Sequence, residues 1–185
     1  EPHVITIEDH TLEIGIRRAA NWTRELVDAS RDRKVFGSVA YQALRQTPDV
    51  VIPGETRAQE AGAILSVVMS DHAVMTTIHA KTPQEAVERF VTCATMPDSY
   101  MYEGRYEDAL RDACSGFDVV IKVDFWEAVG RRLVTEIALI DGTARDGDRL
   151  RPNMIPLAKV DVRPDGEIAW QMKARAVGGR LEWVE

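Results

Sequence analysis

Side chains that could act on a phosphate group follow three apolar runs of the sequence. The first run is followed by Glu8 and Asp9, the second by Glu55 and the third by His79, while Arg57 stands at the start of a predicted helix. A carboxylate beside a phosphoanhydride can orient a water molecule for in-line attack, and a second carboxylate can hold Mg²⁺ through its water shell. Arginine and histidine can donate hydrogen bonds to phosphoryl oxygens, so this set is suited to phosphoryl transfer.

Each of these residues also has an ordinary structural explanation when it is taken alone. An acidic residue after a strand, such as Glu8 or Asp9, is often a helix cap or part of a solvated turn. Glu55 precedes a predicted helix and would interact favourably with the helix dipole. Arg57 could form a surface ion pair, and His79 could be purely structural. The functional interpretation therefore depends on these side chains coming together.

The elements that must bring these side chains together alternate between strand and helix over residues 1–115. Short apolar runs rich in β-branched residues predict strands over residues 4–7, 50–52 and 74–78. Apolar positions at helical spacing and local capping signals predict helices over residues 38–45, 57–69 and 106–114, with another beginning at Thr82-Pro83. Residues 10–37 are expected to be irregular, with a helix near residues 22–29. This alternation predicts an α/β fold with a mostly parallel sheet, in which ligands bind at the carboxyl ends of the strands.

The pattern changes after Gly116, so we divide the chain into residues 1–115 and a β-hairpin extension over residues 116–185. Residues 117–125 and 131–140 are expected to form one hairpin, and residues 141–153 a polar loop. A second hairpin is expected from residues 155–162 and 167–172, because the sequence between them is a strong turn signal.

The composition limits the possible functions. The chain has 185 residues with 23 basic and 30 acidic side chains, which gives a net charge of −7. This acidic balance argues against direct nucleic-acid binding, which needs clustered Lys and Arg. Cys93 and Cys114 lack the spacing of a metal site, and two reduced thiols suit a reducing cytoplasm. No stretch reaches the roughly 18 apolar residues of a membrane span.

Three short motifs stand in a characteristic order. Residues 43–61, ALRQTPDVVIPGETRAQEA, resemble the Walker B region of the type II/type IV secretion ATPase superfamily, whose pattern is A-L-R-x-x-P-D-x-x-x-x-G-E-x-R-x-x-E. Residues 6–9, TIED, resemble the aspartate box of that family, and residues 77–80, TIHA, resemble its histidine box. The resemblance covers residues 4 to about 92 and continues more weakly over residues 118–142.

The resemblance implies a partial RecA-like P-loop NTPase core with a mostly parallel sheet and helices on both faces, followed by antiparallel β-hairpins. It also implies a homo-hexameric motor ATPase that uses ATP and Mg²⁺ to power pilus assembly or the secretion of protein or DNA across the bacterial envelope. Such a motor would be cytoplasmic and peripheral to the inner membrane, with secretion or pilus platform proteins as partners and no direct contact with nucleic acid.

The resemblance also implies roles for individual residues. Glu8 corresponds to the aspartate-box glutamate taken as the catalytic base, and Glu55 to the Walker B glutamate, which would hold the metal through water. His79 corresponds to the histidine near the phosphates. Four further residues are assigned to the nucleotide site or the subunit interface: Asp9, Arg45, Arg57 and His72.

The phosphate-binding loop of this family, G-x-x-x-x-G-K-[ST], does not occur in the sequence. Because the amides and lysine of that loop hold the triphosphate, we expect the 185-residue chain alone to be inactive. The sequence opens with Glu1 and enters a predicted strand at Val4, so we expect a fragment of a longer active ATPase. The alternative is a degenerate or truncated, non-catalytic assembly subunit, with which Pro53 and the Asp71-His72 pair are compatible.

Overall fold

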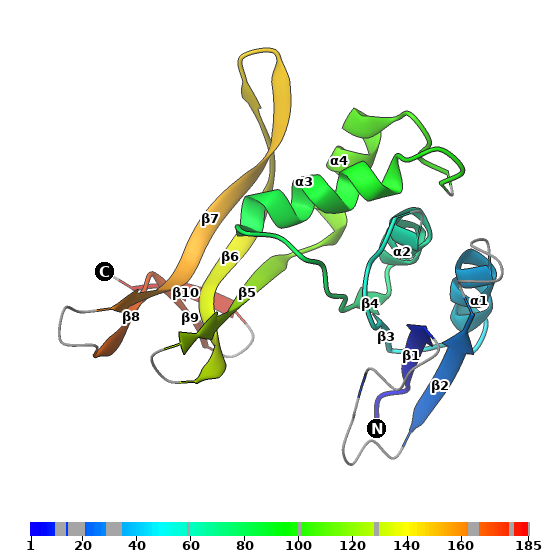
Figure 1. Ribbon diagram of the computed structural model, residues 1–185, viewed down its shortest axis with the longest axis horizontal. Helices are drawn as coiled ribbons and strands as arrows, with labels where there is room; N and C mark the ends of the chain where they lie inside the picture. Colours follow the sequence, from blue (N-terminus) through cyan, green and yellow to red (C-terminus); the bar gives the residue numbers. More distant parts are fainter. Residues whose placement is uncertain are drawn as a thin grey trace.

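A four-stranded parallel sheet forms the N-terminal part of the computed structural model (Figure 1), which describes residues 1–9, 14, 21–28, 35–58, 60–99, 101–127, 130–162, 167–177 and 180–184. The strand order is β2-β1-β3-β4. The strands are β1 (Val4–Asp9), β2 (Trp22–Val27), β3 (Val50–Pro53) and β4 (Ala73–Val74). All three pairings are parallel, so the carboxyl ends of the strands lie at one edge of the sheet.

Two helices pack together beside this sheet, α1 (Val35–Leu44) and α2 (Glu60–Val68). Ile5 and Ile7 of β1 are buried in one apolar cluster with Phe36 of α1 and Ile64 of α2. Alternate side chains of a strand point to opposite faces, so Ile5 and Ile7 share the face that is packed with helix side chains. None of the helices formed by the described residues is long and apolar enough to cross a membrane.

Helices α3 (Pro83–Ala94) and α4 (Tyr106–Gly116) lie between α2 and the second sheet. The start of α3 follows from its sequence: Thr82 is the N-cap, its side chain accepts a hydrogen bond from the backbone N of Glu85, and Pro83 occupies the first turn. Phe90 of α3 meets Phe117 edge to face at a centroid distance of 5.1 Å, which ties the helix to the chain entering the second sheet.

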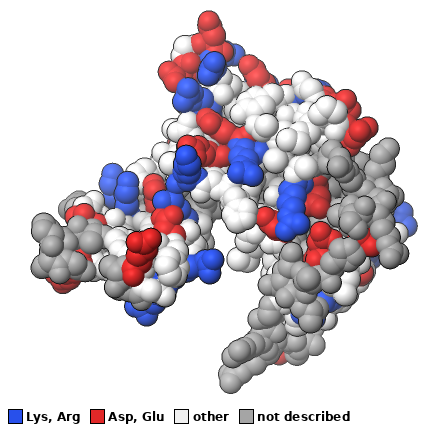
Figure 2. All heavy atoms as spheres, in the orientation of Figure 1, with Lys and Arg blue, Asp and Glu red and all other residues white. Residues whose placement is uncertain are grey.

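The second sheet is antiparallel, with strand order β5-β6-β7-β8. Its strands are β5 (Val119–Trp126), β6 (Arg131–Asp146), β7 (Arg149–Val162) and β8 (Ile168–Met172), and a separate hairpin consists of β9 (Ala174–Val177) and β10 (Arg180–Trp183). Ile140 of β6 belongs to the main apolar cluster, and α4 contacts both β6 and β7. Figure 2 shows basic and acidic side chains intermingled over the described part of one face of the molecule.

The predicted fold class is confirmed: a parallel α/β part is followed by antiparallel hairpins. The strands predicted over residues 4–7 and 50–52 and the helix beginning at Pro83 are all present. Both predicted hairpins are present as β5–β6 and β7–β8, although the turn over residues 163–166 lies outside the described residues.

Three expectations were wrong. Residues 22–27 form β2 rather than a helix, because their backbone pairs in parallel with β1 along its whole length. The strand expected over residues 74–78 ends at Val74 and gives way to an irregular segment, in which Met75 is exposed. The polar loop expected over residues 141–153 is instead a long projection of β6 and β7 around a tight turn, where Gly147 has φ +60°. Charged residues are tolerated there because the hairpin extends into solvent.

Candidate functional site

A pocket lies at the carboxyl ends of β1 and β3. It is lined by two apolar and four charged side chains: Ile7, Asp9, Phe36, Glu55, Arg57 and Glu60. Asp9 is the last residue of β1, and Glu55 comes two residues after the end of β3. The side chains of Asp9, Glu55 and Glu60 thus lie around the guanidinium of Arg57, at the edge of the parallel sheet where a ligand site is expected.

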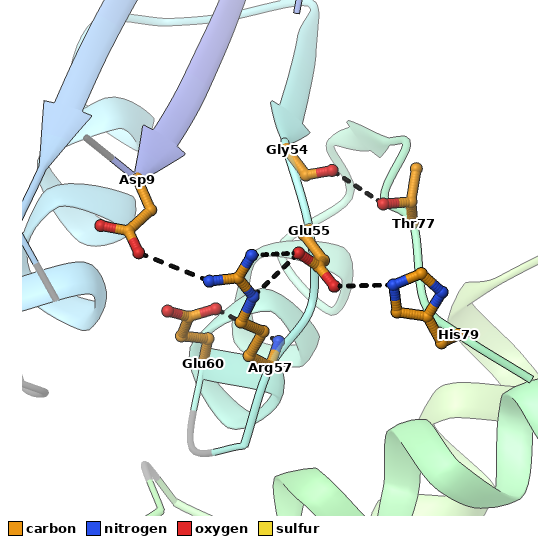
Figure 3. A network of polar contacts seen from close by, with 7 residues as sticks. All are labelled: Asp9, Gly54, Glu55, Arg57, Glu60, Thr77 and His79. Atoms are coloured by element: carbon orange, nitrogen blue, oxygen red, sulfur yellow. Dashed lines mark hydrogen bonds and ion pairs between the residues drawn. The ribbon is translucent and has the colours of Figure 1, made fainter. Parts of the chain in front are cut away.

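Arg57 links the ends of the two strands (Figure 3). Its Nε donates to Glu55 Oε2 at 2.8 Å, its Nη2 contacts the same oxygen, and its Nη1 lies 3.6 Å from Asp9 Oδ2. The other oxygen of Glu55, Oε1, lies 3.3 Å from Nε2 of His79. Asp9, Arg57, Glu55 and His79 therefore form one continuous chain of polar contacts.

Backbone and hydroxyl hydrogen bonds hold the segments that carry these side chains. The amide of Gly54 donates to the carbonyl of Ile7 at 2.9 Å, which carries the β1–β3 pairing one residue beyond Pro53. The amide of Thr56 donates to the carbonyl of Thr77 at 2.7 Å, and Thr77 Oγ1 donates to the carbonyl of Gly54 at 2.8 Å. The irregular segment after β4 is thereby fixed against the segment after β3, which brings His79 to Glu55.

His79 is the most accessible member of the site. Its side chain is 85% exposed, whereas the side chain of Glu55 is 23% exposed. An imidazole that is held at one nitrogen and otherwise open to solvent can donate to an incoming anion. The position of His79 beside Glu55 agrees with the expectation drawn from the three strand ends.

Glu60 is a further acidic residue of the pocket that sequence reasoning did not assign. It opens helix α2, and its Oε2 accepts a hydrogen bond from the backbone N of Arg57 at 3.2 Å. Burial raises the pKa of the Glu60 carboxyl from 4.5 to about 7, and the negative charge of Asp9 adds to this effect, while the hydrogen bond from the Arg57 amide opposes it. The signal was present in the sequence, as the final glutamate of the Walker B pattern.

Glu8 lies on the other side of strand β1. Its side chain is fully buried; Oε1 accepts from Thr6 Oγ1 at 2.9 Å and from Arg24 Nε at 3.0 Å, and Oε2 accepts from the amide of Ile14 at 3.0 Å. Arg24, on β2, also stacks over the ring of Trp22 at 4.2 Å. A buried carboxylate needs such partners, since an unpaired charge would be costly to bury.

The convergence expected of Glu8, Glu55 and His79 is therefore only partly present. Asp9, the neighbour of Glu8, points into the pocket, and Glu8 points away from it because successive side chains of a strand alternate between faces. Sequence reasoning also missed Arg24, the partner of Glu8. If residues 22–27 had been interpreted as a strand, the alternation of side chains would have placed Trp22, Arg24 and Leu26 together on one face.

Arg45 and His72 are not among the residues that line the pocket. Arg45 follows the last residue of α1, whereas Phe36 at the other end of that helix reaches the pocket; nine residues of helix separate them by about 13 Å. The Arg45 guanidinium lies 5.4 Å from the ring centroid of Tyr41. His72 precedes β4, at the amino end of the sheet, and its Nδ1 lies 2.9 Å from the carbonyl oxygen of Ser70.

The donor set fits a metal ion only through water. Among the described residues, no three His, Cys, Asp or Glu side chains are grouped so that they could hold a metal directly. Glu55 is partly exposed at the pocket, so its carboxylate can accept hydrogen bonds from metal-bound water. Asp9 and Glu60 would add negative charge around such an ion.

Comparison with known proteins extends this picture. A family model described as type II/IV secretion system protein matches residues 1–123, which include both flanks of the pocket. An uncharacterized protein of Methanocaldococcus jannaschii is 35% identical over 95 residues, covering 46% of this chain and 33% of its own length. The type IV pilus ATPase PilU of Pseudomonas aeruginosa is 26% identical over 148 residues, covering 78% of this chain and 36% of its own.

A solved structure shares the fold. The VirB11 ATPase of the Brucella suis type IV secretion system, crystallised with sulphate, superimposes with a TM-score of 0.57 and 24% identity, covering 74% of this chain and 39% of that protein. The chain thus spans about a third of the length of the curated relatives it matches. The chain therefore shares its fold with that protein over about three quarters of its length.

Proposed function

The chain belongs to the type II/IV secretion system protein family, and we propose that it is part of a motor ATPase that hydrolyses ATP to power pilus assembly or the export of protein or DNA. The observation that carries the proposal is the chain of contacts from Asp9 through Arg57 and Glu55 to His79 at the carboxyl ends of the strands. Acidic, cationic and imidazole groups at that edge of a parallel sheet are suited to the terminal phosphate of a nucleotide.

Each residue of the site has a proposed task in that reaction. Glu55 would hold the metal ion through water, and His79 and Arg57 would donate to phosphoryl oxygens. When bound, ATP with Mg²⁺ supplies the phosphoanhydride and the positive charge that neutralises its oxygens. Oε2 of Glu55 accepts from Arg57 and Oε1 lies beside Nε2 of His79, so a metal-bound water would share these carboxylate oxygens with Arg57 and His79.

Glu8 remains our proposal for the catalytic base, because it matches the aspartate-box glutamate of the family. In this role its carboxylate has to leave Arg24 and Thr6 and reach the pocket side of β1. The alternative assignment is that Glu8 is a buried positioning residue and that Asp9, which already faces Arg57, orients the water. The two assignments differ in which substitution abolishes turnover.

The remaining expectations about the whole protein are also proposals. We propose a homo-hexamer that works at the cytoplasmic face of the inner membrane, bound there by platform proteins of a secretion or pilus system, without direct contact with nucleic acid. Family membership supports these assignments, and the chain itself spans about a third of its relatives.

ATP turnover of the longest natural form of the protein tests the proposal. Replacing Glu55 by Gln is expected to keep nucleotide binding and lower turnover at least about a hundredfold. Glu8→Gln gives the same loss if Glu8 is the base, and Asp9→Asn gives it if Asp9 has that task. The matched control is Glu103→Gln, an exposed residue outside the pocket. Normal turnover in all three site variants would refute the proposal.

A second candidate function is a non-catalytic assembly subunit. The ion pair that keeps Glu8 buried favours it. In that case the longest natural form would neither bind nor hydrolyse ATP, and the site variants would leave its binding to secretion partners unchanged. Saturable ATP binding to that form would exclude this second candidate.

A further inference from the structure

Thr77 makes two hydrogen bonds to the segment that follows β3. Its Oγ1 donates to the carbonyl of Gly54 at 2.8 Å (Figure 3), and its own carbonyl accepts from the amide of Thr56 at 2.7 Å. Gly54 and Thr56 are the two neighbours of Glu55 in the sequence. Thr77 is therefore bonded to the backbone on both sides of the carboxylate at which the polar contacts of the site meet.

Thr77 and His79 present their side chains to the same neighbour. Both side chains point toward the segment that follows β3 (Figure 3). The residues beside them are more buried: Ile78 packs against the main apolar cluster, and Thr76 Oγ1 lies 2.7 Å from Oγ1 of the buried Thr56. The hydroxyl of Thr77 is thus the side-chain bond that lies next to the imidazole along the chain.

The imidazole itself is weakly held. The side chain of His79 is 85% exposed, and its Nε2 lies 3.3 Å from Oε1 of Glu55. We propose that Thr77 is a positioning residue of the nucleotide site, whose hydroxyl keeps the imidazole of His79 beside the carboxylate of Glu55. This role rests on the motor ATPase function proposed above. A side chain so exposed has few packing contacts, so its position depends on the backbone that carries it.

The position of the imidazole matters because phosphoryl transfer is catalysed mainly by holding charged and hydrogen-bonding groups in place. A displacement of about 1 Å can lower a rate by about a hundredfold. Without the Thr77 hydroxyl, the bond from the amide of Thr56 still attaches the segment, but at one point instead of two. The expected loss of turnover is therefore at least about tenfold, which is smaller than the loss expected for a group that acts on the phosphate directly.

ATP turnover of the longest natural form of the protein tests this role. Thr77→Val keeps the size of the side chain but removes the donor, and it is expected to lower turnover at least about tenfold. Thr77→Ser keeps the hydroxyl and is expected to stay within about twofold of the native protein. The matched control is Thr92→Val on α3, because Thr92 Oγ1 also donates to a backbone carbonyl, that of Glu88, and lies outside the pocket. Native turnover in Thr77→Val overturns the proposal, as does an equal loss in Thr77→Ser.

A double-mutant cycle measures whether Thr77 acts through His79. Glu55 keeps a support of its own, because the amide of Gly54 donates to the carbonyl of Ile7 at 2.9 Å, so the effect of the hydroxyl is expected to pass through the imidazole. In a His79→Ala background, adding Thr77→Val is therefore expected to lower turnover by no more than about a further twofold. The same loss in both backgrounds would show that Thr77 acts independently of His79, and it would overturn the proposal.

Hydrogen exchange of the same proteins separates this inference from the proposed function. The amide of Thr56 donates to the carbonyl of Thr77, so it is expected to exchange at least about fivefold faster in Thr77→Val than in the native protein or in Thr77→Ser. This result does not require ATP hydrolysis. If the native protein has no turnover, the proposed function fails, while faster exchange still supports the fixing of the segment by the Thr77 hydroxyl. Unchanged exchange of the Thr56 amide overturns the inference even in an active ATPase.

Discussion

The raised pKa of Glu60 makes a quantitative prediction about the replacement Glu60→Gln. Glu60 is half-buried at the pocket, and burial is the largest cause that raises its pKa from 4.5 to about 7. Glutamine has nearly the same shape and keeps an oxygen that can accept the hydrogen bond from the amide of Arg57, which Glu60 now accepts at 3.2 Å. The replacement therefore removes the charge while it preserves the local contact.

Proton linkage gives the direction in which the stability of the protein changes with pH. Between pH 4.5 and about 7 the Glu60 carboxyl is protonated to a greater extent in the folded protein than in the unfolded chain. The free energy of unfolding therefore decreases as the pH rises through that interval. The full shift corresponds to roughly 3 kcal/mol, and solvent screening of a half-buried group reduces this to about 1–2 kcal/mol. Glu60→Gln lacks the titration, so the variant is expected to gain about 1–2 kcal/mol relative to the native chain between pH 5 and pH 8.

Urea unfolding of both chains at pH 5, 6, 7 and 8 measures this difference. Contributions from titrating groups that do not interact with Glu60 are common to the two chains and cancel when the free energies of unfolding are subtracted. Glu103→Gln, at an exposed position, is the control that makes the same change of side chain outside the pocket. If the difference between Glu60→Gln and the native chain is constant from pH 5 to pH 8, the carboxylate is not destabilised by burial and the reasoning is refuted.

Three further predictions concern the stability of the fold. Arg24→Met leaves the buried carboxylate of Glu8 without its cation and should cost about 3 kcal/mol in urea unfolding; adding Glu8→Gln should recover part of the loss, and no recovery would contradict the ion-pair explanation. Thr82→Ala removes the cap of α3 and should cost about 1 kcal/mol, whereas Thr82→Ser should cost little. Gly116→Ala places a Cβ 2.4 Å from a side-chain carbon of α2 and should cost about 1–3 kcal/mol, while Gly37→Ala, with 3.7 Å to its nearest neighbour, should be neutral or stabilising; equal effects in thermal unfolding would show that close packing at Gly116 is not the cause.

Local sequence signals correctly predicted the elements whose own residues favour the conformation that the structure shows. The β-branched runs of β1 and β3 are buried strands, and the Thr82-Pro83 pair begins a helix where its capping chemistry places it. These features depend on hydrophobic periodicity and on interactions within three or four residues, which can be recognised without knowing the fold.

Other elements depend on partners far away in the sequence. β2 is half-exposed and mixed in composition, and it is a strand because β1 lies beside it. The segment after Val74 has strand-like residues, but the bonds of Met75, Thr76 and Thr77 to β3 and to the segment after it do not form a regular ladder. For such segments the backbone pairing decides the conformation, and composition alone is a weak guide.

The sequence by itself determined the types of group in the site and their order along the chain: acids after the first two strands, an arginine at a helix start and a histidine after the third apolar run. The tertiary structure decided which acid reaches Arg57. Side chains of a strand alternate with a period of two, so Asp9 enters the pocket and Glu8 is buried against Arg24 on the other face. The sequence motif contains both residues, but only the pairing of β1 between β2 and β3 determines on which face of the sheet each side chain lies.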